Sequence, residues 1–455
     1  MIRDVTDREV MRDYAAAVRQ QLEAGQLDSP TTARAAAAIA PGAQANPAQQ
    51  IADSMPSDGI GEASSGVHED PFVGRDPIVS LLQTSIETKL HDEGVVSGEA
   101  PDSGAHGFFS RLRHKIEGLL HHQRFGPDDP EWVTEVAKAM LERLAMGNHP
   151  FNPVPAEHEI SDDARVVVVG DWGSGLARAR EVAGFMAEEV REALADGRQA
   201  HVVHLGDVYY SGDPKEYDRH VLDEGWWPVT PEQADGGVTS WSLNGNHDMY
   251  SGGWGYFDHL LADERFKNQR ADGRSTSFFR LKSSSWSIVG LDTSWDPNVL
   301  TSGHTGVLHD PQAEVVSRWA GEDDSRKLVL LSHHQFVSAY DPRGIGADLE
   351  AKLEPLYDSG RITAWMWGHE HRCMGFATPQ VEFLRCIGNG GVPVRSRPNG
   401  APLQPPAVWE LTGHYEAEGR QWGRFGFAVL DLAGDHIDVR YRDDQGGETR
   451  RETIA

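Results

Sequence analysis

Cysteines, long apolar runs and basic residues are all scarce in this 455-residue sequence. It has two cysteines, Cys373 and Cys386, which excludes a disulfide scaffold and favours reduced thiols. No apolar run approaches the ~20 residues of a membrane-spanning helix. The first residues also lack the basic and then apolar pattern of a secretory signal. We therefore expect a cytoplasmic protein without a membrane span.

The scarcity of basic residues bears on the kind of partner. Lys and Arg number 42 against 70 Asp and Glu, which gives a formal net charge of −28. The acidic excess is spread over both halves of the chain, so no broad basic surface is available to bind phosphate backbones, and no nucleic-acid partner is expected. Multivalent cations remain possible partners. The hydrophobic content of 39% is enough for a sizeable core.

The first 150 residues carry helical patterns and no recognisable strand. An N-terminal helix is predicted over 1–25, followed by a disordered linker, rich in Ala, Pro, Gly and Ser, over 26–72. A helical appendage is predicted over 73–150. Within it, residues 107–126 form an amphipathic segment that either packs on the main domain or meets a membrane surface or partner.

The pattern changes near residue 163 to short β-branched runs that alternate with helical segments. Such runs are typical of strands buried on both faces of an α/β sheet. They lie at 165–170, 202–205, 240–243, 277–281, 286–291, 328–331 and 363–367, and 425–441 resembles a closing hairpin. We predict an α/β catalytic domain over 163–445. Within it, residues 392–420 are either a substrate lid or a plain surface insertion.

Five of the predicted strands end in side chains that can bind a metal ion. These are Asp171; Asp207 with Tyr210; Asn246 with His247 and Asp248; His333; and His369 with His371. Ligands of open α/β sheets gather at the carboxyl ends of the strands, so these side chains are expected to converge. The mixture of carboxylate, amide, phenol and imidazole suits Fe, Mn or Zn. So many ligands exceed the needs of one ion, whereas two ions that share a bridging carboxylate would use them all.

Five short motifs also resemble, in order and spacing, those of the calcineurin-like metallophosphoesterases. They are GDWG (170–173), GDVYY (206–210), GNHD (245–248), LLSH (330–333) and GHEH (368–371). The resemblance covers roughly 163–445 and implies a four-layer αββα sandwich. The first motif usually has a His two places after its Asp, where Gly173 stands here. The second motif has Tyr210 three places after Asp207, which resembles the purple acid phosphatase branch.

The resemblance implies a role for each of these residues. One ion would be held by Asp171, Tyr210 and His371, the other by Asn246, His333 and His369, with Asp207 bridging them. The ions would be Fe with Fe, Mn or Zn. The catalytic pair would be His247, as proton donor or transition-state stabiliser, and Asp248, as an orienting residue. His334 would face the phosphate of the substrate. Among the neighbours, Tyr209 competes with Tyr210, and the three-residue offset favours Tyr210.

The implied activity is hydrolysis of a phosphomonoester, or a diester, in a small phosphorylated substrate by metal-bound hydroxide. One alternative is a cyclic-nucleotide or nucleotide-sugar phosphodiesterase, against which Gly173 argues. Another is a metal-free scaffold that binds partners through its helical N-terminus. A Ser/Thr protein phosphatase is disfavoured, because the second motif lacks the arginine of GDxVDRG. The physiological substrate, the role of residues 1–150 and the oligomeric state are left open.

Overall fold

The computed structural model describes residues 146–296, 306–322, 325–340, 347–397, 402–403, 406–417 and 420–455, together with positions 135, 139 and 143. These last three positions, with Met146, have helical backbone. The predicted N-terminal helix, the linker and most of the appendage lie outside the described residues. The account below concerns the compact unit Asn148–Ala455.

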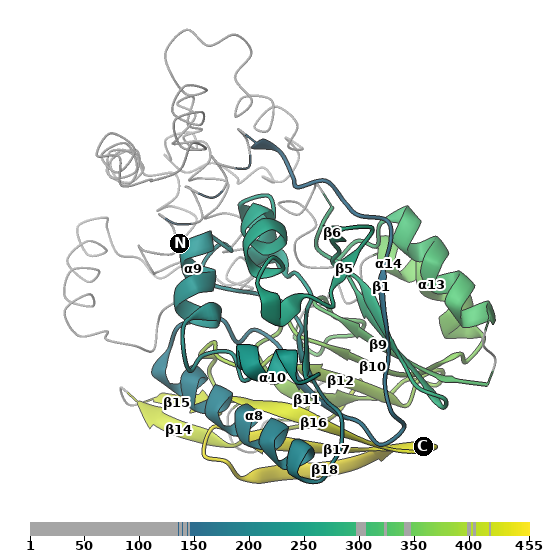
Figure 1. Cartoon of the computed structure of the whole chain (residues 1–455). Helices are drawn as coiled ribbons and strands as arrows, with labels where there is room; N and C mark the ends of the chain where they lie inside the picture. Colours follow the sequence, from purple (N-terminus) through teal and green to yellow (C-terminus); the bar gives the residue numbers. More distant parts are fainter. Residues whose placement is uncertain are drawn as a thin grey trace, which may run out of the picture. The chain divides into compact units, whose positions relative to one another are not determined.

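The smaller of two large β-sheets has six strands in the order β18-β17-β16-β2-β3-β4 (Figure 1). Three neighbouring strands run parallel, namely β2 (Arg165–Val169), β3 (Ala200–His204) and β4 (Thr239–Ser242). The other three continue the sheet in antiparallel fashion: β16 (Gly426–Ala433), β17 (His436–Asp443) and β18 (Glu448–Ile454). The predicted closing hairpin at 425–441 is confirmed as β16 and β17.

The larger sheet has eight strands in the order β1-β7-β8-β9-β10-β12-β11-β13. Its central strands β8 (Trp286–Leu291), β9 (Lys327–Ser332), β10 (Ile362–Trp367) and β12 (Phe383–Ile387) are parallel. Its flanking strands are β1 (Ala156–Glu159), β7 (Phe279–Lys282), β11 (Cys373–Phe376) and β13 (Ala407–Glu410). Two small hairpins are formed by β5 (Arg270–Ala271) with β6 (Arg274–Ser275), and by β14 (His414–Ala417) with β15 (Arg420–Gly423).

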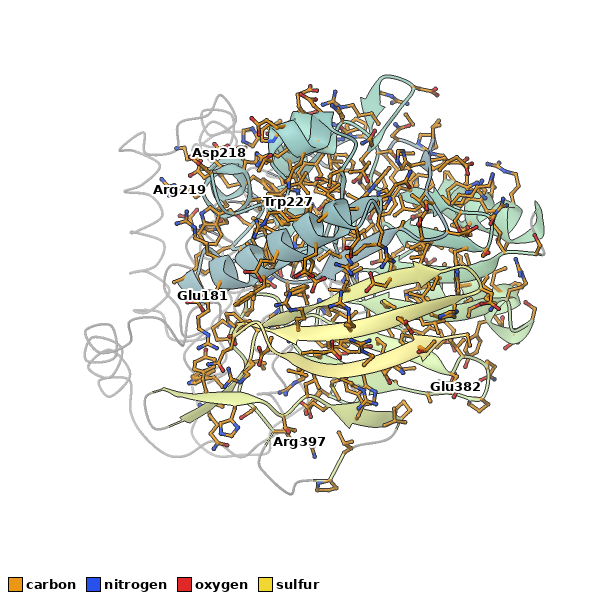
Figure 2. The ribbon with its side chains drawn as sticks, turned by 60° about the horizontal axis from the view of Figure 1, so that its bottom comes forward. Glu181, Asp218, Arg219, Trp227, Glu382 and Arg397 are labelled. Carbon is orange, nitrogen blue, oxygen red and sulfur yellow. The ribbon has the colours of Figure 1, made fainter. Side chains whose placement is uncertain are left out.

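Three longer helices cover the outer faces of the sheets. Helix α8 (Ala177–Ala195) lies on the smaller sheet against β2, β3 and β16. Figure 2 shows this helix, marked by Glu181, beside the yellow C-terminal strands. Helices α13 (Asp310–Glu322) and α14 (Ala347–Asp358) pack on the larger sheet. The shorter helices are α9 (Pro214–Tyr217), η3 (Asp218–Leu222), α10 (Pro231–Asp235), α11 (Asn246–Tyr250), η4 (Tyr256–Leu260) and η5 (Glu264–Phe266). No helix in the described part of the chain is long and apolar enough to cross a membrane.

Alternation along the strands explains how these layers hold together. In β2, Val166 and Val168 join the core between the two sheets, so Val167 and Val169 face the other way, toward the α8 layer. A second core lies between the larger sheet and its helices, where Trp319 of α13 belongs to the same cluster as buried strand residues. The layers therefore read helix, sheet, sheet, helix, which confirms the predicted αββα sandwich.

The sheets also include β1 and β18, which lie outside the predicted range 163–445. The division of the whole chain into domains stays a prediction. Both cysteines are free and buried, in accord with the expectation of reduced thiols. The parallel strands have a functional consequence, because β2, β3 and β4 of one sheet and β9 and β10 of the other lead directly into the loops with the predicted ligands.

Candidate metal centre

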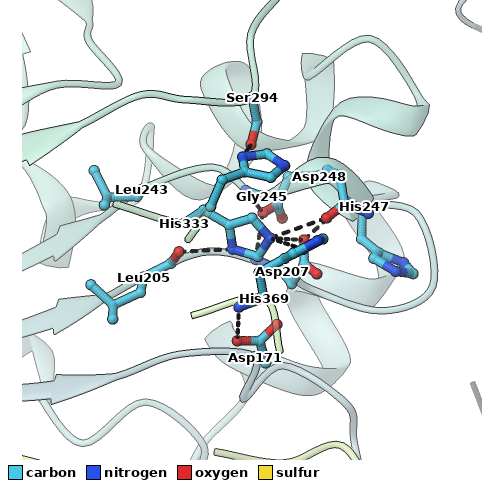
Figure 3. A network of polar contacts seen from close by, with 12 residues as sticks. Asp171, Leu205, Asp207, Leu243, Gly245, His247, Asp248, Ser294, His333 and His369 are labelled. Atoms are coloured by element: carbon cyan, nitrogen blue, oxygen red, sulfur yellow. Dashed lines mark hydrogen bonds and ion pairs between the residues drawn. The ribbon is translucent and has the colours of Figure 1, made fainter. Parts of the chain in front are cut away.

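The loops that follow five strands meet at one place (Figure 3). The backbone N–H of His369, after β10, donates to Asp171 Oδ2, after β2, at 2.7 Å. The backbone N–H of His247, after β4, donates to Asp207 Oδ1, after β3, at 2.9 Å. His333 directly follows β9 and lies at the centre of the group in Figure 3. The strand ends thus converge as the sequence predicted.

A first set of side chains gathers around the hydroxyl group of Tyr209. This oxygen lies 3.1 Å from Asp171 Oδ1, 3.1 Å from Asp207 Oδ2 and 3.0 Å from His371 Nε2. His371 Nε2 is in turn 3.5 Å from Asp171 Oδ1. Three separate loops therefore bring two carboxylates, a phenol and an imidazole within reach of one position.

The tyrosine in this set is not the one that the sequence favoured. Two contacts of Tyr210 are made by its backbone: its N–H donates to Glu216, and its carbonyl oxygen lies 2.6 Å from His247 Nδ1. An offset counted along the chain fixes the loop but not which of two adjacent side chains turns inward. The geometry favours Tyr209 for the phenol ligand, and a ligand role for Tyr210 stays a prediction.

A second set of side chains surrounds His333 Nε2. This atom lies 3.1 Å from Asn246 Oδ1, 3.2 Å from His369 Nδ1 and 3.5 Å from Asp207 Oδ1. The other ring nitrogen, Nδ1, lies 3.0 Å from the carbonyl oxygen of Leu205, which requires the proton to be on Nδ1. The lone pair of Nε2 then points at the other acceptors, an arrangement that a cation would stabilise.

Asp207 lies between the two sets. Its Oδ2 faces Tyr209, whereas its Oδ1 faces His333 and accepts the N–H of His247. The residue is 1% exposed. One buried carboxylate therefore has an oxygen in each group of candidate ligands.

The electrostatics of the site also fit a bound cation. Burial and the nearby charge of Asp207 hold the pKa of Asp171 well above its usual range. Burial and the same two carboxylates raise the pKa of Tyr209. Burial lowers the pKa of His333 to about 3, so its imidazole is neutral and has a lone pair to donate. Within the described residues, two groups have donor atoms close enough to hold an ion: Asp171, Asp207 and His333, and His333, His334 and His369.

Asp248 ties two of the ligand loops together. Its carboxylate accepts the backbone N–H groups of Gly245 at 2.7 Å, Asp207 at 2.8 Å and Val208 at 3.2 Å, as well as the hydroxyl of Tyr217. Burial, with the charge of Asp207, raises the pKa of Asp248 to about 7. These contacts hold the loops after β3 and β4 together, and the orienting role of Asp248 in catalysis stays a prediction.

His247 is buried beside the first set of ligands. Its ring centroid lies 4.4 Å from that of Tyr209, and its Nδ1 meets the carbonyl oxygen of Tyr210. The backbone N–H of His247 therefore contacts Asp207, and its ring contacts Tyr209 and the carbonyl oxygen of Tyr210.

His334 lies against the second set, with its ring centroid 4.8 Å from that of His369 and 5.0 Å from that of His333. Its Nδ1 lies 3.0 Å from Thr293 Oγ1 and 3.4 Å from Ser294 Oγ, on the loop that follows β8. Sequence reasoning missed these two hydroxyl residues. The signal that located the other site residues was present here too: residues 286–291 were predicted as a strand, and polar residues follow it.

Comparison with known proteins agrees with this geometry. Residues 164–373 match the model of the calcineurin-like phosphoesterase family. No curated protein matches the chain.

Solved structures that match the chain include GAP50, the anchor in the inner membrane complex of Plasmodium. It is 11% identical, with 64% of this chain and 88% of that chain covered and a TM-score of 0.44. A predicted phosphoesterase from Streptococcus pneumoniae is 11% identical, with 64% and 96% covered and a TM-score of 0.26. A cold-active protein-tyrosine phosphatase of a Shewanella species is 14% identical, with 68% and 88% covered and a TM-score of 0.29. Residues 164–373 are therefore similar to the calcineurin-like phosphoesterase family, and this range includes the loops that converge at the candidate site.

Proposed function

We propose that this domain is a dinuclear metal-dependent phosphoesterase that hydrolyses a phosphomonoester, or a diester, of a small phosphorylated substrate. The observation that carries the proposal is the position of Asp207, whose two carboxylate oxygens face different groups of candidate ligands. One group would be Asp171, Tyr209 and His371, and the other Asn246, His333 and His369. A carboxylate shared in this way is what a pair of ions requires.

The donor chemistry supports Fe paired with Fe, Mn or Zn. Carboxylate, phenol and imidazole ligands suit these borderline metals, and a phenolate favours a ferric ion. We assign the phenol to Tyr209 in place of Tyr210, because the hydroxyl of Tyr209 lies 3.1 Å from both Asp171 and Asp207. Tyr209 stands two places after Asp207, so the link to the purple acid phosphatase branch rests on the phenol and not on the three-residue offset. When bound, two such ions lower the pKa of water and offset the charge of a phosphate group.

The other residues of the site would act on the substrate directly or hold the loops. His247 Nδ1 donates to the carbonyl oxygen of Tyr210, which orients the ring. The Nε2 atom of His247 would then pass a proton to the leaving oxygen. His334 would contact the phosphate. Asp248 would keep Asp207 in place, because its carboxylate accepts the backbone N–H of Asp207.

Metal analysis and hydrolysis assays test this proposal together. We expect about two ions per chain after loading with Fe, Mn or Zn. The loaded protein should hydrolyse p-nitrophenyl phosphate or bis(p-nitrophenyl) phosphate. Asp207→Ala should lose both metal pairing and hydrolysis, because it removes the shared carboxylate.

Asp272→Ala is the matched control. Asp272 is exposed and has a φ of 51°, and Asp207 also has a positive φ, of 73°. The control therefore separates the effect of placing alanine at a positive φ from the effect of losing the Asp207 carboxylate. It should retain both properties. An Asp207→Ala variant that still binds two ions and turns over would overturn the bridging role. A wild-type chain that takes up no metal would favour the scaffold alternative.

A further inference from the structure

The loop after β8 contacts the candidate site at His334. Thr293 Oγ1 makes two contacts with this residue: it accepts the backbone N–H of His334 at 3.2 Å, and it lies 3.0 Å from His334 Nδ1. Ser294 Oγ adds a longer contact to Nδ1 at 3.4 Å. One hydroxyl group therefore fixes both the peptide and the ring of the same histidine.

The loop that supplies these hydroxyls is itself firmly held. Asp292 Oδ1 accepts the N–H groups of Ser294 at 3.0 Å and Trp295 at 2.9 Å. Gln312, on α13, accepts the N–H of Asp292 at 2.8 Å and donates to its carbonyl oxygen at 2.7 Å. The positions of Thr293 and Ser294 are therefore set by β8 and by α13.

His334 is also confined on its other sides. Gly306, with a φ of +63°, packs so closely that a Cβ atom there would lie 2.8 Å from His334 Cβ. The hydroxyl of Ser332 donates to the carbonyl oxygen of His334 at 2.8 Å, and Trp365 Nε1 donates to the same hydroxyl at 2.8 Å. His334 is 1% exposed, and its imidazole has little room to turn without losing these contacts.

We propose that Thr293, assisted by Ser294, is a positioning residue that holds the imidazole of His334 toward the phosphate group of the substrate. This inference rests on the proposed function and deepens it. A neutral imidazole has one donor and one acceptor nitrogen. Because Nδ1 is engaged by Thr293, an incoming phosphate oxygen would be met by Nε2.

The test uses the full-length, metal-loaded protein and compares Thr293→Val with Thr293→Ser. Valine keeps the shape and removes the hydroxyl, whereas serine keeps the hydroxyl. The readouts are metal content, the Kd for inorganic phosphate by calorimetry, and KM and kcat on p-nitrophenyl phosphate. One hydrogen bond corresponds to a change of about 3- to 10-fold in an equilibrium constant. We expect Thr293→Val to weaken phosphate binding and raise KM by that factor, with metal content and kcat unchanged, and Thr293→Ser to restore binding.

Thr239→Val is the matched control. Thr239 is also buried and its Oγ1 lies 2.7 Å from a histidine, His201 Nδ1, but on β4 away from the predicted ligands. It should leave phosphate affinity unchanged. Ser294→Ala should show a smaller effect than Thr293→Val because its contact is longer.

Three results would overturn the positioning role: unchanged phosphate affinity in Thr293→Val, an equal loss in Thr293→Ser, or loss of metal in either variant. The last result would make the loop part of the metal centre or of the fold as a whole. Phosphate affinity is measured without turnover, so the test also separates two failures. If the loaded wild type binds phosphate but hydrolyses no ester, the proposed function fails, and the comparison of valine with serine still decides the role of Thr293.

Discussion

A buried ion cluster joins α8 to the smaller sheet and allows a stability prediction to be worked out. Glu189 of α8 has a side chain that is 1% exposed. Its carboxylate accepts hydrogen bonds from Arg165 at 2.8 Å, from Arg440 at 2.7 and 3.0 Å, and from Arg442 at 2.8 Å. The three arginines come from β2 and β17, so one carboxylate connects the helix with both strands.

Glu189→Gln keeps the shape of the side chain but removes its charge. The three arginine side chains, which are only 7%, 14% and 13% exposed, would then lack a buried anion. Removing one partner of a buried ion pair costs about 3–5 kcal/mol. We expect a loss near the lower end of this range, because Asp431 still pairs with Arg165 and Arg440 in the variant. With an unfolding entropy of about 2.1 cal/mol/K per residue, a loss of about 3 kcal/mol lowers the Tm of the unit Asn148–Ala455 by roughly 5 °C.

Urea and thermal unfolding of the wild type and the variant measure this loss. Glu192→Gln is the matched control, since Glu192 lies on the same helix, 3.7 Å from Arg165, but its side chain is 63% exposed. The control should lose less than about 1 kcal/mol. A loss below about 1 kcal/mol in Glu189→Gln would refute the reasoning, because the cluster would then be no stronger than a surface pair.

The same cluster predicts a dependence on pH. Burial would raise the pKa of Glu189, but the hydrogen bonds and charge of Arg440, with those of Arg442 and Arg165, outweigh it and lower the pKa. A pKa that is lower in the folded state gives stability above the unfolded value of about 4.3, and this stability is lost as the pH falls through the folded pKa. The wild type should therefore lose more stability than Glu189→Gln on acidification.

Three further predictions concern the metal centre. Tyr209→Phe should lower ferric-ion affinity and remove a visible charge-transfer band, whereas Tyr210→Phe should keep both; the reverse result would restore Tyr210 as the ligand. Gly245→Ala should lower the metal content found by elemental analysis, because the new Cβ atom would collide with Asp207 Oδ1. A variant with full metal content would contradict this close packing. Asp248→Asn should weaken metal binding about 10- to 100-fold in a metal titration. Lost turnover with unchanged metal affinity would instead indicate that Asp248 acts directly on the substrate.

The strand ends were predictable because each combines two local signals. A short apolar run marks a strand buried on both faces, and the polar residues after it cannot continue that strand. The runs 165–170, 202–205 and 328–331 became β2, β3 and β9, each followed by candidate ligands. Strand β1 was missed because Ala156–Glu159 has no apolar pattern. Its strand character comes from parallel pairing with β7, which lies far away in the sequence.

Side-chain direction within a loop was not predictable in the same way. Tyr209 and Tyr210 are adjacent and chemically identical, so only the path of the backbone decides which hydroxyl reaches the two aspartates. Thr293 raises a related difficulty. Its role depends on contact with His334, which follows another strand, and a single sequence gives no measure of that proximity.

The backbone of the site carries a strain that the rest of the fold offsets. Asp171, Asp207, His369 and His371 have φ values of 55°, 73°, 68° and 52°, and among the other described non-glycine residues Asp272 alone has a positive φ. Such conformations cost of order 1–3 kcal/mol each. In return, the chain turns sharply at each strand end, and the N–H of His369 can donate to Asp171. The candidate ligands are therefore held close together by backbone geometry and hydrogen bonds of the protein alone, so an arriving ion would meet groups that are already arranged to receive it.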